Sequence, residues 1–162
     1  MISFKDAYKK VLALYQDFGL EQIPLETAMG RVLAEDIVAD RNFPPFNRAT
    51  KDGIAINYDA IENGLTSFKI EGVLAAGMPS QQLKDTSNCI EIMTGAVVPN
   101  NADTVVMYEH LIIEYGSATL TKKPNRGQDI HLDGSDQIKG DLVLKKHCIL
   151  SASEIGILAA VG

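Results

Sequence analysis

Apolar residues recur at helical spacing at the start of the chain. From Phe4 to Phe18 they lie three or four positions apart, and Ser3 followed by Asp6 resembles an N-terminal capping box. Gly19 then supplies a residue type at which helices commonly end. The pattern predicts a helix over most of this stretch, and its wide apolar stripe requires burial against another surface.

The pattern then changes from helical to extended. Residues 24–33 predict a short helix that Gly30 weakens, and residues 34–40 predict a strand. Between residues 53 and 120, short β-type runs alternate with turn residues. That spacing is typical of a small β-barrel or sandwich.

These patterns together predict an α+β fold that is mostly β. It has an N-terminal helix in residues 1–19 and a mixed α/β linking domain made of residues 20–46 and 138–162. A small barrel-like β domain, residues 47–137, is inserted in the linking domain. Ser151 with Glu154 forms a second capping box, which predicts a helix near the end of the linking domain.

The composition narrows the possible partners. The chain has 162 residues, of which 46% are hydrophobic and 22% charged, an ordinary globular composition. No apolar run approaches the roughly 20 residues that a membrane helix needs. A formal net charge of −6 disfavours nucleic acid and anionic membranes as partners. Two distant cysteines without metal or redox spacing, and an N-terminus without a signal-peptide pattern, favour a reduced cytoplasmic setting.

Two segments place a polar side chain beside a glycine at the end of a β run. Asp52-Gly53 follows a proline-containing stretch, residues 43–46, and its carboxylate is placed to hold a cation or a polar ligand. Thr94-Gly95 ends another β run, where the glycine permits close approach of a ligand to the backbone. Local pattern alone favours a plain Asp-Gly turn and a plain hairpin loop over these binding sites.

A third segment, residues 129–136, contains three carboxylates and a histidine. Carboxylate oxygens suit Mg²⁺, but the spacing differs from the ligand ladder of an EF-hand. His131 has no partner histidine at helical spacing, which leaves little argument for zinc. A solvated acidic loop stays open as the alternative.

Taken together, the segments resemble the MoeA/gephyrin E-domain family. Residues 43–46 and 51–56 (KDGIAI) are similar to the linker of that family and to its DGYAV signature. Residues 91–99 (EIMTGAVVP) and 102–109 (ADTVVMYE) are similar to its IMTGAPVP…ADAVVxxE block. Residues 129–136 (DIHLDGSD) resemble its NIRxxGED block. The order and the separations of the blocks also agree, so the resemblance covers essentially the whole chain.

The resemblance implies an enzyme of molybdenum cofactor biosynthesis, a molybdopterin molybdenumtransferase. Members insert molybdate into adenylated molybdopterin with Mg²⁺ and release AMP, and they are homodimers of several domains with small-molecule substrates. On this basis we expect the chain to be the N-terminal portion of a longer protein and to be inactive alone. A dimerisation or partner-binding scaffold, as in gephyrin, is the alternative function.

The resemblance also assigns site residues. Asp52 and Asp136 match the acids of the DGYAV and NIRxxGED blocks, which implies catalytic roles and the binding of Mg²⁺. Thr94 and Gly95 match the IMTGA block, and together with Lys51 they are expected to contact the substrate. In the family, the cleft forms between this β domain of one subunit and an α/β domain of the other.

Several positions depart from the pattern of the family. Ile54 stands where an aromatic residue is usual, and Arg48 occupies a position that is often small or polar. Asp129 and Ser135 replace the usual Asn and Glu. These differences concern fine substrate contacts and leave the resemblance intact.

Overall fold

The structure is a computed structural model and describes residues 2–161. The chain divides into two compact units. Among the described residues, the first unit comprises residues 2–37 and 143–160, and the second comprises Val38–Leu142 and Val161. No helix in the described part of the chain is long and apolar enough to cross a membrane.

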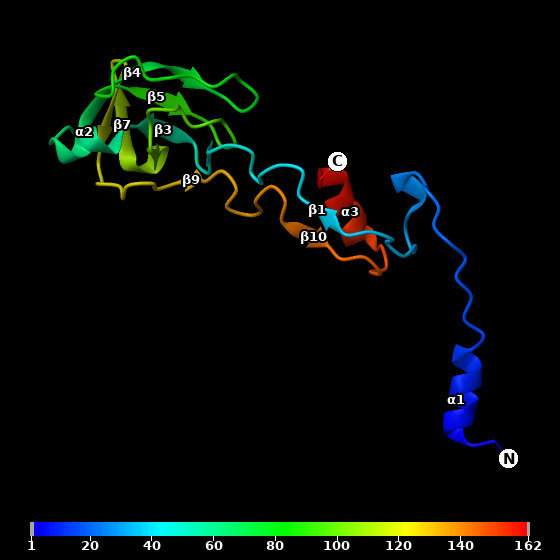
Figure 1. Cartoon of the computed structure of the whole chain (residues 1–162). Helices are drawn as coiled ribbons and strands as arrows, with labels where there is room; N and C mark the ends of the chain where they lie inside the picture. Colours follow the sequence, from blue (N-terminus) through cyan, green and yellow to red (C-terminus); the bar gives the residue numbers. More distant parts are fainter. Residues whose placement is uncertain (1, 162) are drawn as a thin grey trace. The chain divides into compact units, whose positions relative to one another are not determined.

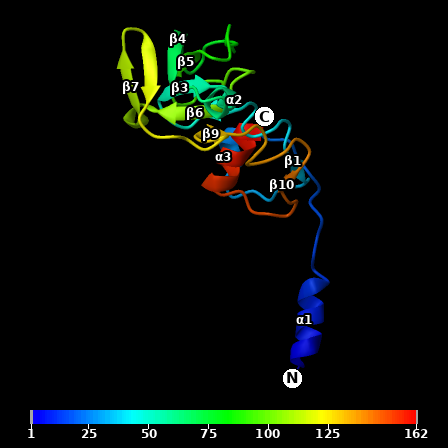
Figure 2. The same cartoon turned by 90° about the vertical axis from the view of Figure 1, so that its left-hand side faces the viewer.

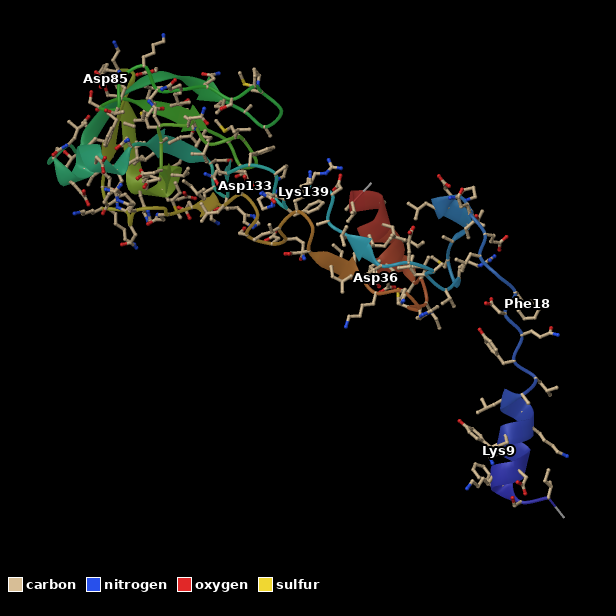
Figure 3. All side chains as sticks on the ribbon, in the orientation of Figure 1. Lys9, Phe18, Asp36, Asp85, Asp133 and Lys139 are labelled. Carbon is tan, nitrogen blue, oxygen red and sulfur yellow. The ribbon has the colours of Figure 1, made fainter. Side chains whose placement is uncertain are left out.

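Helix α1 spans Phe4–Leu12 and begins at the predicted cap, where Ser3 Oγ accepts a hydrogen bond from the Asp6 amide at 3.2 Å. The helix ends well before Gly19, so its predicted length is wrong. None of its residues is buried, and a short helix without a tertiary partner gains little from adding further turns. Phe18, beyond the helix, is 91% exposed (Figure 3).

The other two patterns expected before residue 41 are realised only in part. A single 3-10 turn, η1 at Leu25–Thr27, replaces the predicted second helix, and Gly30 at φ +77° then redirects the chain. The predicted strand is reduced to β1, Ile37–Val38, which pairs with β10, Leu142–Leu144, in a two-stranded sheet.

Helix α3, Ala152–Val161, begins at the predicted capping box. The Ser151 amide donates to the Glu154 carboxylate at 2.9 Å, and Ser151 Oγ accepts from the Ser153 amide at 3.3 Å. Hydrogen bonds from the Ser151 hydroxyl and amide lower the pKa of Glu154. The second capping box is therefore confirmed.

The second unit is built on a curled six-stranded sheet in the order β6-β3-β5-β4-β8-β7 (Figures 1 and 2). Its strands are β3 (Gly53–Ile56), β4 (Ser67–Leu74), β5 (Cys89–Ile92), β6 (Thr104–Met107), β7 (Leu111–Glu114) and β8 (Ser117–Leu120). Neighbours are antiparallel except β4 and β5, which run parallel. This sheet confirms the predicted mostly-β, barrel-like class.

Shorter elements complete the second unit. Strand β2, Arg48–Ala49, pairs antiparallel with β9, Ile130–His131. Helix α2, Tyr58–Glu62, and the 3-10 turn η2, Tyr108–His110, were not foreseen from the sequence. Both are too short to show a helical repeat of apolar residues. Asn57 caps α2 by accepting a hydrogen bond from an amide of the first turn.

The core of the second unit consists of two clusters of buried residues, and neighbouring residues of β3 belong to different clusters. One cluster contains Ala49, Ala55, Leu74, Leu83, Ile90, Ile92, Ala96, Val98 and Val105. The other contains Ile54, Ile56, Tyr58, Ile61, Phe68, Cys89, Val106 and Ala118. Every residue of β3 is buried, which explains its uninterrupted apolar run. Burial also raises the pKa of the Cys89 thiol to about 12.

Gly53 begins β3 at a point where β6 comes very close. A Cβ atom added at residue 53 would lie 1.9 Å from the carbonyl oxygen of Val106. Gly53 pairs with Met107 on β6 and with Ile92 on β5, so the contact lies inside the sheet. Only glycine fits there without moving one of the strands.

We therefore expect Gly53→Ala to lower the free energy of unfolding by about 3 kcal/mol, because the added methyl forces β3 and β6 apart. Urea denaturation, followed by circular dichroism, measures this change. Gly72→Ala is the matched control, since a Cβ there meets nothing within 4 Å. Equal midpoints for the two variants would contradict the packing argument.

Candidate functional site

Asp52 and Thr94 meet at one end of the central strands. Asp52 immediately precedes β3 and Thr94 follows β5, and these strands are antiparallel neighbours with Gly53 opposite Ile92. The start of one strand therefore lies beside the end of the other. Asp52 Oδ1 accepts hydrogen bonds from the Thr94 amide at 2.6 Å and from the Thr94 hydroxyl at 2.7 Å.

These two hydrogen bonds stabilise the ionised form of the carboxyl group. The Thr94 hydroxyl and then the Thr94 amide lower the pKa of Asp52, and slight burial opposes them. Because both bonds reach Oδ1, the other oxygen of Asp52 is left free for a ligand. The side chain is exposed, so this oxygen is accessible.

The backbone carbonyl of Asp52 is held by the turn that follows β6. The carbonyl of Asp52 accepts from the Tyr108 amide at 3.1 Å. Burial, followed by the negative charges of Glu91 and Asp52, raises the pKa of the Tyr108 phenol. Sequence patterns did not single out Tyr108, because its proximity to Asp52 depends on the register between β3 and β6.

Gly95 and Lys51 flank this pair. Gly95 adopts φ +84°, and its amide donates to the Ala49 carbonyl at 2.8 Å, so this amide is already engaged within the chain. Lys51 is exposed, and no ion pair joins it to a carboxylate in the described residues. The Thr94 hydroxyl donates its hydrogen bond to Asp52 and keeps only acceptor capacity for a ligand.

Asp136 belongs to a separate set of contacts. Its Oδ1 lies 2.8 Å from His131 Nε2, and His131 Nδ1 lies 3.1 Å from Arg48 Nη2. The three side chains therefore form a chain of hydrogen bonds between β2, β9 and the loop after β9. From the sequence, Arg48 stood out only as a departure from the family pattern, and His131 only as an isolated histidine. Neither pattern indicated that the two side chains are in contact.

Backbone hydrogen bonds hold the Asp136 segment against the stretch before β2 (Figure 3, near Asp133). The Asp136 amide donates to the Phe43 carbonyl and the Gly134 amide to the Pro44 carbonyl, each at 2.9 Å. The Asp133 amide donates to the Asn47 side chain at 2.8 Å. These bonds run along the whole loop, so it has a defined path on the unit.

The motif segments also border a hollow of about 270 Å³. It is lined by Pro45, Phe46, Asn47, Val97, Val98, Pro99, Asn100, Ala102 and Asp133. This lining does not include Asp52, Thr94 or Asp136. Across residues 2–161, no cluster of three or more His, Cys, Asp or Glu side chains is arranged to hold a metal ion.

The geometry thus links Asp52 with Thr94, and Asp136 with His131 and Arg48. No hydrogen bond within the described residues joins the first group to the second. Each aspartate keeps one oxygen that accepts nothing from the described chain, so the two carboxylates can serve ligands.

Comparison with known proteins identifies the family. The family described as "MoeA N-terminal region (domain I and II)" matches residues 2–162. A protein named molybdopterin molybdenumtransferase from Synechocystis sp. is 34% identical over 164 residues, which cover 100% of this chain and 42% of that protein. The protein of the same name from Staphylococcus epidermidis is 34% identical over 165 residues, 99% of this chain and 39% of that protein.

A solved structure agrees with these matches. A molybdopterin biosynthesis MoeA protein from Pyrococcus horikosii superposes with a TM-score of 0.86 at 31% identity, covering 99% of this chain and 42% of that chain. The chain thus spans about two fifths of the length of the relatives that it matches. By sequence along its whole described length, and by its fold, this chain belongs to the MoeA N-terminal region family.

Proposed function

We propose that the protein containing this chain is a molybdopterin molybdenumtransferase, which inserts molybdate into adenylated molybdopterin and releases AMP. The names of its relatives support this activity. The observation that carries the proposal is Asp52, whose ionised carboxylate is fixed by two hydrogen bonds from Thr94 where β3 and β5 meet.

Asp52 and Asp136 would hold Mg²⁺ and act as the catalytic carboxylates. Their hard oxygen donors suit this ion, which commonly uses one or two carboxylates and completes its shell with water and substrate oxygens. Mg²⁺ would supply charge neutralisation for phosphate and molybdate oxygens. Hydrogen bonds from Thr94 lower the pKa of Asp52, which favours the ionised form that such a ligand requires.

Lys51, Thr94 and Gly95 are the proposed substrate contacts. Lys51 offers an exposed ammonium group next to Asp52, suited to a phosphate as a point charge. The Thr94 hydroxyl oxygen has acceptor capacity beyond its bond to Asp52. The positive φ of Gly95 keeps the backbone free of a side chain beside this pair.

We further propose that the full-length protein is a cytoplasmic homodimer with small-molecule substrates. The net charge of −6 supports a protein that binds neither nucleic acid nor anionic membranes. The hollow in the second unit is not lined by Asp52, Thr94 or Asp136. This supports a cleft around these residues that is completed by another part of the homodimer.

In the full-length protein, we expect Asp52→Asn and Asp136→Asn each to lower the rate of molybdenum cofactor formation at least about 10-fold. The amide oxygen still accepts hydrogen bonds from Thr94 or His131, so folding is kept while the negative charge is lost. The rate is measured with adenylated molybdopterin, molybdate and Mg²⁺.

Asp85→Asn is the matched control for these variants. Asp85 is also exposed and also accepts from the amide and the hydroxyl of one residue, Ser87, at 2.8 and 2.7 Å. Figure 3 shows Asp85 on a different part of the second unit from Asp133, which lies in the segment of Asp136. Full activity in both site variants, or an equal loss in Asp85→Asn, would remove Asp52 and Asp136 from the site.

The 162-residue chain by itself is expected to form no molybdenum cofactor. The reason is that the chain spans about two fifths of the length of its relatives, so the proposed cleft lacks the part that the rest of the protein would supply. The same assay, with the full-length protein as the positive control, measures this. Turnover by the chain alone would show that the site is complete without further residues.

A dimerisation or partner-binding module is the second candidate function. The observation favouring it is the exposed apolar stripe of α1, where Tyr8 is 56% and Val11 66% exposed. Under this alternative the chain elutes as a dimer, and Val11→Glu makes it monomeric while Lys9→Glu on the same helix does not. Size-exclusion chromatography with light scattering measures the mass, and a wild-type monomer would exclude self-association through α1.

A further inference from the structure

Arg48 differs from the other arginines of the chain in its partner. Arg31 pairs with Glu21, Arg41 with Asp40, and Arg126 with Asp59, Glu62 and Asp103. Arg48 has no carboxylate partner among the described residues, and its side-chain hydrogen bond goes to the ring of His131. The guanidinium therefore acts on a histidine that in turn contacts Asp136.

The chemistry of the guanidinium fixes the direction of these bonds. Arginine has only donors, so the 3.1 Å contact from Arg48 Nη2 to His131 Nδ1 is a hydrogen bond only when Nδ1 carries no proton. A neutral imidazole then has its proton on Nε2. That proton points to Asp136 Oδ1, 2.8 Å away. Arg48 thus selects the form of His131 that donates to Asp136.

The backbone around all three residues is anchored independently of their side chains. Arg48 and His131 lie opposite each other in the β2–β9 pair. The neighbouring pair is Ala49 and Ile130, and Ala49 is only 1% exposed. The Asp136 amide donates to the Phe43 carbonyl. Because the backbone is fixed at these points, the side-chain contacts decide only how the carboxylate of Asp136 is turned.

We propose that Arg48 is a positioning residue, which holds His131 as the Nε2–H tautomer and thereby keeps Asp136 in one rotamer with Oδ2 free. This inference rests on the proposed function for the importance of Asp136. Its test uses no substrate and no turnover. The positioning role of Arg48 can therefore fail while the proposed activity stands, and the proposed activity can fail while the positioning role stands.

The tautomer of His131 is read from the ¹⁵N shifts of its ring in the 162-residue chain, which contains three histidines. The spectra are recorded near pH 8, above the ordinary histidine pKa of about 6.5. His131→Gln assigns the signals. We expect a single Nε2–H tautomer in the wild-type chain and also in Asp136→Ala, where Arg48 still donates to Nδ1.

Loss of Arg48 should remove the preference of His131 for the Nε2–H tautomer. In Arg48→Ala combined with Asp136→Ala, the two ring nitrogens are expected to shift toward the averaged values of a free imidazole. Arg48→Lys combined with Asp136→Ala should restore the single tautomer, because an ammonium group is also a pure donor. An Nδ1–H tautomer in the wild type, or averaging already in Asp136→Ala, would overturn the proposal.

The rotamer of Asp136 is the second readout. Its Hα–Hβ coupling constants should indicate one rotamer in the wild type and averaging in Arg48→Ala and in His131→Ala. Dispersed amide spectra in both variants show that the unit remains folded. A single Asp136 rotamer in both folded variants would mean that Arg48 and His131 do not position the carboxylate.

Discussion

The close approach of β3 to β6 at Gly53 is the constraint on which the rest of the second unit depends. Residue 53 has no room for a Cβ atom because the carbonyl of Val106 occupies that space. Every residue of β3 is buried, and Gly53 pairs with Ile92 on β5 and with Met107 on β6. Asp52, the residue before Gly53, is thereby brought to the end of β5, where Thr94 supplies two donors.

The site is thus made where strands end, and its side chains are exposed although their backbone is fixed. Core packing cannot orient such side chains, so hydrogen bonds must do so. Thr94 holds one oxygen of Asp52, and His131 holds one oxygen of Asp136. In each case the second oxygen is left for a ligand, an arrangement that gives orientation without saturating the carboxylate.

Two features of the described residues are exposed to solvent. The apolar stripe of α1 buries no residue, and the carboxylates of Asp52 and Asp136 lie outside the lining of the nearby hollow. Apolar surface of this kind marks contact sites, and the second oxygen of each carboxylate has acceptor capacity for a cation or a donor of a ligand. Both features agree with a chain that spans about two fifths of its relatives.

The sequence by itself determined what depends on neighbouring residues: the capping boxes at Ser3 and Ser151, the apolar β runs, and the motif segments that contain Asp52, Thr94 and Asp136. Tertiary structure decided how the site residues pair. Asp52 and Thr94 are separated by 42 positions, and Arg48 and His131 by 83. Such pairs arise from strand register, a property of the assembled sheet that no local pattern contains.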